Sequence, residues 1–120
     1  NANELLQDVF ENIILNAVKY NEKDEVCIFI KVSKTQNDGN EYNKIEFIDN
    51  GIGIPDERKL IIFKQGNRDL KGTKGMGLGL SLVKRILNAF NGKIWVEDKV
   101  KGDFTQGSNF IILLPELEQI

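Results

Sequence analysis

The sequence contains no histidine, only one cysteine and no strong excess of charge of either sign. The absence of histidine excludes histidine-based catalytic triads, histidine metal sites and a histidine general base. Any chemistry must therefore rely on carboxylates, amides, lysine, arginine, backbone groups or a bound ion. The formal net charge of −2 argues against general binding to nucleic acid, because proteins of that class usually carry a basic excess.

The single cysteine, Cys27, cannot form a disulfide within the chain, which favours a reducing, cytoplasmic compartment. It lies in an apolar segment, so we expect a buried and unreactive thiol. No apolar run reaches the ~18 residues of a membrane span, and the N-terminus lacks the basic and apolar regions of a signal peptide. We expect this segment to make no membrane contact and to be part of a longer protein, which an anchor elsewhere could hold at a membrane.

Apolar and turn-forming residues divide the chain into helices and strands. Apolar residues at spacings of three and four predict helices over 3–21 and 78–90, and we expect a short helix over 56–63. Runs rich in β-branched and aromatic residues predict strands over 26–32, 43–49, 93–98 and 108–114, with turns over 36–40 and 99–107. We expect residues 1–120 to form a single α+β domain, a two-layer sandwich with helices on one face of a mixed, mostly antiparallel sheet.

Three polar residues form a stripe along the first predicted helix. Asn12, Asn16 and Lys19 stand at spacings of four and three, and therefore lie within about 60° of one another around the helix. Asparagine is a poor helix former, so the pair needs an explanation. A solvated helix edge is one explanation. The other is a pair of amide oxygens that holds Mg²⁺, with Lys19 beside it to contact a phosphate.

The segment DNGIGIP, residues 49–55, follows an apolar strand with an aspartate and two glycines. A turn after the strand accounts for Asp49 and Gly51 but not for Gly53. The alternative is a binding site. Asp49 would accept a hydrogen bond from a ring amine, such as the exocyclic nitrogen of adenine, while the glycines allow a planar group to approach.

The segment GTKGMGLGL, residues 72–80, places four glycines immediately before a run of helix formers. It fits neither the P-loop pattern, because Leu78 and Gly79 stand where Lys and Ser or Thr are required, nor the dinucleotide pattern, because Leu80 replaces its third glycine. A flexible linker would have Ser-rich or Pro-rich surroundings. We therefore favour a loop whose amides, together with the positive end of the following helix, bind phosphates. The preceding segment, residues 58–74, supports this interpretation with its basic side chains, which are Arg58, Lys59, Lys64, Arg68, Lys71 and Lys74.

Four motifs occur in one order along nearly the whole chain: NIILNAVKYN, DNGIGIP, IFKQGNR and GTKGMGLGLSLVKRIL. In this order and at these separations they resemble the catalytic ATP-binding domain of sensor histidine kinases. That domain is a member of the GHKL superfamily, which also contains gyrase B, MutL and a major heat-shock chaperone. The resemblance implies a Bergerat-type ATP-binding fold with ATP and Mg²⁺ as ligands. It also implies donation of the γ-phosphoryl group to a histidine in two-component signal transduction.

The resemblance implies a role for each matching residue. Asn16 would bind Mg²⁺, while Lys19 and Arg68 would contact phosphates and act in the transfer. Asp49 would accept the adenine amine, with the Ser108 hydroxyl beside it. The full set of expected nucleotide-binding residues is Asn12, Asn16, Lys19, Tyr20, Asp49, Gly51, Gly53, Ile54, Phe63, Lys64, Arg68, Thr73, Gly75, Met76, Gly77, Leu78, Gly79, Leu80 and Ser108.

The chain departs from the family pattern in ways that bear on function. Many members carry a second aromatic residue three positions after Phe63, where this chain has Gly66. The family's phosphoacceptor is a histidine on a separate helical hairpin, and this chain has no histidine. Asn12 occupies the position at which ATPases of the superfamily have a water-activating glutamate. Because an amide cannot take a proton, this residue favours a kinase over a hydrolase.

The implied partners are ATP and ADP, the phosphoacceptor hairpin of the same full-length kinase and, indirectly, a response regulator. We expect the isolated domain to be a monomer and the parent protein to be a homodimer. Two alternatives stay open. One is a nucleotide-binding interaction module without transfer activity. The other is an anti-sigma-factor-type serine kinase, which shares the fold and needs no histidine of its own.

Overall fold

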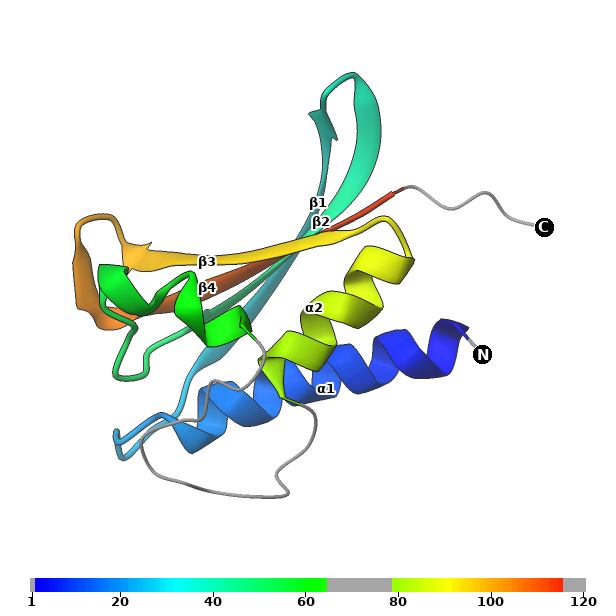
Figure 1. Ribbon diagram of the computed structural model, residues 1–120. Helices are drawn as coiled ribbons and strands as arrows, with labels where there is room; N and C mark the ends of the chain where they lie inside the picture. Colours follow the sequence, from blue (N-terminus) through cyan, green and yellow to red (C-terminus); the bar gives the residue numbers. More distant parts are fainter. Residues whose placement is uncertain (1, 65–78, 116–120) are drawn as a thin grey trace.

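The computed structural model describes residues 2–64 and 79–115. Its elements follow in the order α1 (Ala2–Lys19), β1 (Ile28–Asn37), β2 (Asn40–Asp49), the 3₁₀ helices η1 (Asp56–Arg58) and η2 (Ile61–Phe63), α2 (Leu80–Ala89), β3 (Lys93–Val100) and β4 (Asp103–Pro115). Figure 1 shows two layers, in which α1 and α2 lie against one face of the sheet. No helix in the described residues is both long enough and apolar enough to cross a membrane.

The sheet has four strands in the order β1-β2-β4-β3, and every neighbouring pair is antiparallel. The predicted α+β architecture, with helices on one face of the sheet, is therefore confirmed. The expected parallel component is not found among the described strands. Because β4 lies between β2 and β3, it joins the two hairpins. The pairing of Ile48 with Asn109 places the end of β2 beside residues 107–109.

The strands are longer than the sequence pattern predicts. β1 and β2 continue to a tight turn at Asp38 and Gly39, whose φ angles are +53° and +82°. β4 begins at Asp103, inside the segment predicted as a turn, because the chain reverses at Gly102 with a φ of +86°. Polar residues at hairpin ends show no apolar alternation, so pairing with the neighbouring strand decides where these strands end. The short helix predicted over 56–63 is two separate 3₁₀ helices.

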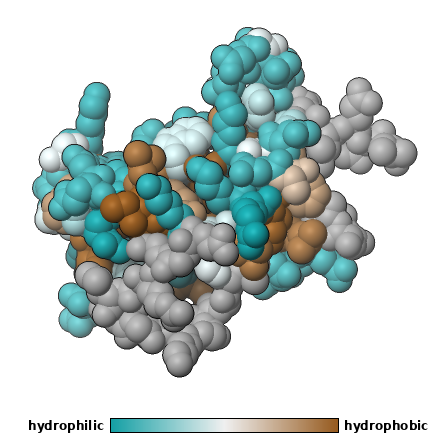
Figure 2. Space-filling model, in the orientation of Figure 1, coloured by the Kyte–Doolittle hydropathy of each residue, from teal (hydrophilic) through white to brown (hydrophobic). Residues whose placement is uncertain are grey.

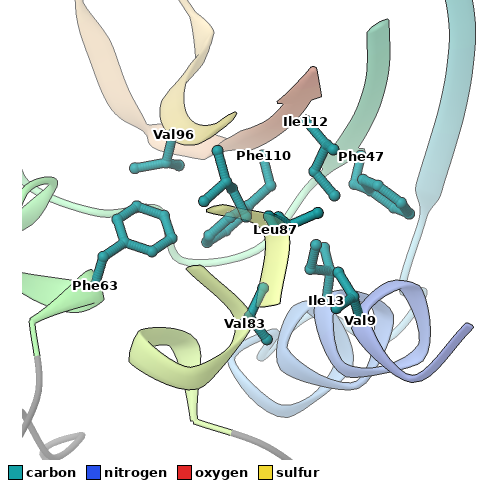
Figure 3. Close-up of a cluster of buried hydrophobic side chains, with 10 residues drawn as sticks. Val9, Ile13, Phe47, Phe63, Val83, Leu87, Val96, Phe110 and Ile112 are labelled. Carbon is teal, nitrogen blue, oxygen red and sulfur yellow. The ribbon is translucent and has the colours of Figure 1, made fainter. Parts of the chain in front are cut away.

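One apolar cluster joins the two layers (Figure 3). It is made by Val9, Ile13, Phe47, Phe63, Val83, Leu87, Ile94, Val96, Phe110 and Ile112. Its members on each long helix are four residues apart, which keeps them on the same side of the helix. Full burial of one such side chain contributes about 1.5–3 kcal/mol. The cluster therefore holds both helices against the sheet and positions the loops at their ends.

β1 is an edge strand and lies largely outside this core. Phe29, Ile30 and Val32 are exposed. The β1–β2 hairpin projects beyond the helices (Figure 1) and has a hydrophilic tip (Figure 2). Cys27, which immediately precedes β1, is also exposed. The prediction of a buried thiol is therefore wrong, because the apolar run belongs to the edge of the sheet and not to its centre.

Candidate functional site

The carboxylate of Asp49 lies at the end of β2 and is the most deeply buried acidic group of the site, with only 6% of the residue exposed. Its Oδ1 accepts hydrogen bonds from the amide of Gly51 (2.9 Å) and from the amide of Ser108 (3.2 Å). Residues 59 positions apart in the sequence thus meet through the pairing of β2 with β4. Both hydrogen bonds end on Oδ1, so Oδ2 is the oxygen that could accept a hydrogen bond from a ligand.

Burial raises the pKa of Asp49 above its ordinary value of 3.8. The two backbone hydrogen bonds and the positive charges of Lys99 and Lys23 oppose this effect without cancelling it. A buried carboxylate is unfavourable unless it is paired or hydrogen-bonded. Burial therefore disfavours the charged form of this acidic group. Groups with a pKa shifted in this way are frequent in binding and catalytic sites.

Gly107 makes the contact between β4 and Asp49 possible, and it is absent from the residues predicted for the site. Its φ is +125°, and a methyl group on its Cα would lie 2.0 Å from the main-chain oxygen of Asp49. Only glycine fits both the backbone angle and the space. Its position immediately before Ser108, a predicted site residue, was the sequence signal that could have placed Gly107 in the site. The surrounding pattern predicts only a turn.

Packing within the protein itself requires a glycine at position 53 and leaves little room for a side chain at Gly51. A methyl group at Gly51 would lie 3.0 Å from the carbonyl oxygen of Tyr20, and one at Gly53 would lie 1.7 Å from the carbonyl oxygen of Phe104. Gly53 also has a φ of +80°. These contacts press the loop after β2 against α1 on one side and against β4 on the other, which accounts for the second glycine that a simple turn did not explain.

Asn50 ties the loop that follows α1 to the end of β2. Its Oδ1 accepts hydrogen bonds from the side chain of Asn21 (2.6 Å) and the amide of Cys27 (3.0 Å), and its Nδ2 donates to the carbonyl of Glu25 (3.1 Å). The carbonyl of Asn50 accepts a hydrogen bond from Nζ of Lys23 (2.8 Å). The local sequence around Asn50 predicts only a turn, because these partners are 23 to 29 positions away.

The predicted polar stripe of α1 is divided between two environments. Asn12 is 7% exposed and its Nδ2 donates to the carbonyl of Asp8 (2.7 Å), so the solvated-edge explanation is wrong for it. Asn16 is half-buried. Nζ of Lys19 lies 5.2 Å from the centre of the Tyr20 ring. The Tyr20 carbonyl accepts a hydrogen bond from the amide of Ile52 (3.2 Å), which brings this end of α1 to the Asp49 loop.

The remaining predicted residues fall into two groups. Phe63 is a core residue that packs edge-on against Phe110, with 6.2 Å between the ring centres, and Leu80 also packs against the core. Gly79 precedes the first residue of α2 in extended conformation, and among the described residues no atom beyond its chain neighbours lies within 4 Å of the position that a Cβ would take there. Ile54 is half-buried and Lys64 is exposed. The predicted site residues outside the described ranges are Arg68, Thr73, Gly75, Met76, Gly77 and Leu78.

The ammonium group of Lys59 contacts acceptors within the protein and is not among the basic groups that could bind a phosphate. Its Nζ donates to the carbonyl of Ile54 (2.9 Å), contacts the carboxylate of Asp56 and lies 2.8 Å from Oδ1 of Asp98. Its side chain is 17% exposed. The expectation that all six basic residues between 58 and 74 supply charge to phosphates is therefore wrong for Lys59, because carboxylates of the protein already neutralise it.

The chain matches a family model over residues 1–118, and the family is described as "Histidine kinase-, DNA gyrase B-, and HSP90-like ATPase". It is 35% identical over 113 residues to the sensor histidine kinase AruS of Pseudomonas aeruginosa, a match that covers 91% of this chain and 11% of AruS. It is 37% identical over 116 residues to the adaptive-response sensory kinase SasA of Gloeothece citriformis (93% of this chain, 27% of SasA). It is 38% identical over 117 residues to the sensor protein kinase WalK of Staphylococcus aureus (92% of this chain, 26% of WalK).

Solved structures share the fold. The mycobacterial sensor histidine kinase MprB superposes with a TM-score of 0.75 at 24% identity, covering 93% of this chain and 72% of that one. The catalytic domain of the histidine kinase ThkA gives 0.74 at 26% identity (93% and 66%). Full-length ShkA in complex with AMPPNP gives 0.66 at 27% identity (92% and 21%). This chain thus spans only a small part of the full-length relatives.

Replacement of Gly107 by alanine will destabilise the protein more than replacement of Gly102. Both residues have positive φ angles, but only the Gly107 methyl group would overlap the Asp49 backbone, whereas Gly102 faces open space. We expect a difference of at least about 2 kcal/mol in the free energy of unfolding. Urea denaturation of the two variants measures it, and equal losses would contradict the close approach of β4 to Asp49.

Replacement of Asp49 by asparagine will change how stability depends on pH. The pKa of Asp49 is higher in the folded than in the unfolded chain, so wild-type folding loses stability as pH rises from 3.8 through the folded-state pKa. Asparagine can accept the same two amide hydrogen bonds without a charge. We therefore expect the stability of Asp49→Asn relative to wild type to increase over this range and then level off. Denaturation at a series of pH values measures the difference in unfolding free energy between the variant and wild type. A difference that stays flat or falls with pH would refute a raised pKa of Asp49.

Proposed function

The chain belongs to the family of histidine kinase-, DNA gyrase B- and HSP90-like ATPases, and from that membership we propose that it binds ATP with Mg²⁺ and donates the γ-phosphoryl group to a histidine on a separate domain. In this proposal the chain is the ATP-binding catalytic domain of a histidine protein kinase in two-component signalling. It has no activity of its own without the phosphoacceptor domain. The buried carboxylate of Asp49 is the observation that carries the proposal.

Asp49 has the properties required of a group that recognises adenine. Its carboxylate is buried, it is oriented through Oδ1 by two backbone amides, and its remaining oxygen can accept a hydrogen bond from the exocyclic amine. The amide of Ser108 holds the carboxylate, and the Ser108 hydroxyl would take part in the same hydrogen-bond network. Ile54, which packs against the core from the adjoining loop, would supply an apolar surface for the ring. Tyr20 would pack along the base or ribose from the end of α1.

The polar end of α1 fits Mg²⁺ and phosphate. Mg²⁺ binds hard oxygen ligands and usually takes only one or two from the protein. The half-buried amide of Asn16 would supply such an oxygen, with Asn12 supporting it from the preceding turn. Lys19, in the last turn of the same helix, would contact a phosphate. Bound Mg²⁺ would neutralise phosphate charge, while these side chains orient the nucleotide.

The N-terminal end of α2 and the segment before it would bind the phosphates. Within the described part of the chain, no other residue crowds Gly79 at the start of a ten-residue helix, where the amides of a first helical turn and the helix dipole favour an anion. Lys64 is exposed at the beginning of this segment. The remaining phosphate contacts would come from residues outside the described ranges, which are Thr73, Gly75, Met76, Gly77 and Leu78. Arg68, also outside these ranges, would act on the γ-phosphoryl group.

The environment of Asn12 supports transfer to a protein acceptor in preference to hydrolysis. A hydrolase needs a general base near the attacking water. Asn12 cannot take up a proton, and its amide nitrogen is bound to the Asp8 carbonyl. The acceptor would be a histidine on the helical hairpin of the full-length kinase, from which a response regulator would receive the phosphoryl group. We further propose a cytoplasmic location, a monomeric isolated domain and a homodimeric parent protein.

Replacement of Asp49 by asparagine will abolish measurable ATP binding while the domain stays folded. The amide keeps the size of the carboxylate but presents a different hydrogen-bond pattern to adenine. Calorimetric titration with Mg²⁺ and ATP measures the affinity, and circular dichroism monitors the fold. The exposed turn residue Asp38, replaced by asparagine, is the matched control and should bind as wild type does. Wild-type affinity in Asp49→Asn would refute the adenine assignment.

Phosphoryl transfer tests the kinase proposal directly. The chain, joined to the phosphoacceptor hairpin of its full-length kinase, should form acid-labile phosphohistidine with radiolabelled ATP and Mg²⁺. Arg68→Ala should bind ATP normally and transfer at least about tenfold more slowly, because a charge-stabilising contact in the transition state is lost. ATP binding without transfer would favour an interaction module. Acid-stable phosphoserine would favour an anti-sigma-factor-type kinase.

A further inference from the structure

Lys59 has a set of partners that the proposed nucleotide site does not explain. Its ammonium group donates to the Ile54 carbonyl (2.9 Å), contacts Asp56 and lies 2.8 Å from Oδ1 of Asp98. Hydrogen bonds to Ile54 and Asp56 use two of the three N–H donors of this ammonium group, and the Asp98 carboxylate forms an ion pair with it. The side chains of Lys59 and Asp98 are 17% and 13% exposed. The pair is therefore largely withdrawn from water.

Lys59 keeps its positive charge through its contacts with carboxylates. Burial by itself would lower the pKa of Lys59, but its contacts with Asp56 and Asp98 outweigh burial and raise the pKa above 10.5. The Asp56 side chain is 88% exposed, so Asp98 is the partner that lies with Lys59 away from solvent. Removal of one member of a buried pair leaves the other charge uncompensated, which is strongly unfavourable.

The pair joins the loop after β2 to the strand next to β4. Ile54 follows Gly53, whose Cα is pressed against the Phe104 backbone of β4. Lys59 then donates to the Ile54 carbonyl and contacts Asp98 on β3. The loop is thus held at two points, one on each strand of the β3–β4 hairpin.

The position of Asp98 on β3 also connects the pair to the buried carboxylate of Asp49. Asp98 is the register partner of Ser108, and the Ser108 amide binds Oδ1 of Asp49. A shift of the loop relative to β3 would therefore change the distance between Ile54 and Asp49, the two residues proposed above to contact the adenine ring.

We propose that Lys59 and Asp98 form a positioning pair for the nucleotide base, which holds the main chain of Gly53 and Ile54 at the depth that the adenine ring requires. The inference rests on the proposed function. Neither residue touches the nucleotide. Both act through the loop, so they govern affinity for the base and its discrimination, and they leave binding of the phosphates unchanged.

Replacement of Lys59 by methionine tests the inference, because it keeps an unbranched side chain and removes the charge. By calorimetry, we expect the dissociation constants of ADP and of adenosine to rise by the same factor, about tenfold, as preorganisation is lost. The preference for ADP over inosine diphosphate, which lacks the exocyclic amine, should fall. Asp98→Asn should give the same pattern. Lys59→Arg, which keeps the charge, should restore most of the affinity.

Lys93→Met is the matched control. Lys93 is at the far end of β3, where it contacts Asn37 and the Tyr42 ring, and its loss should leave both affinities unchanged. A lower unfolding midpoint in Lys59→Met with unchanged affinities would show a merely structural role and overturn the inference. Failure of both Lys59→Met and Asp98→Asn to fold would also overturn it. Failure of the wild-type chain to bind ADP would instead refute the proposed function, and the inference with it.

Discussion

The hydrogen bonds that hold the buried carboxylate of Asp49 are the constraint on which the rest of the site depends. A carboxylate at this depth needs donors, and Gly51 and Ser108 supply them from two different segments. The second donor is within reach only because β4 pairs directly with β2 and because Gly107 lets the two backbones approach. Strand order, glycine placement and the acidic group therefore form one structural unit.

The apolar core places the other parts of the site around this carboxylate. α1 is fixed to the sheet by Val9 and Ile13, and its C-terminal end is joined to the loop after β2 by the hydrogen bond between Tyr20 and Ile52. The buried face of α2 packs against the same core, and this contact fixes the position of the N-terminal end of the helix. In the proposed function, α1 provides metal and phosphate contacts, the loop provides the base contacts, and α2 receives the phosphates.

Much of the fold and the family could be predicted from the sequence. The resemblance to the ATP-binding domain of sensor histidine kinases is confirmed by the family match and by the relatives, and both long helices and all four strands of the described residues were predicted. The environments of single residues could not be predicted. Cys27 is exposed because its segment ends at an edge strand, and Lys59 is neutralised by Asp98, 39 positions away. The predicted nucleotide contacts stay predictions.

Local sequence was enough to specify the types of element and the order of the motifs, because both depend on residues that are near one another in the chain. Helical periodicity, strand-forming runs and glycine clusters are signals of this kind. Which distant groups meet was settled only by the folded arrangement: Ser108 with Asp49, Asp98 with Lys59, and Phe104 with Gly53. The cause is that burial and hydrogen bonding depend on strand pairing and close packing, which bring together residues that no local pattern relates.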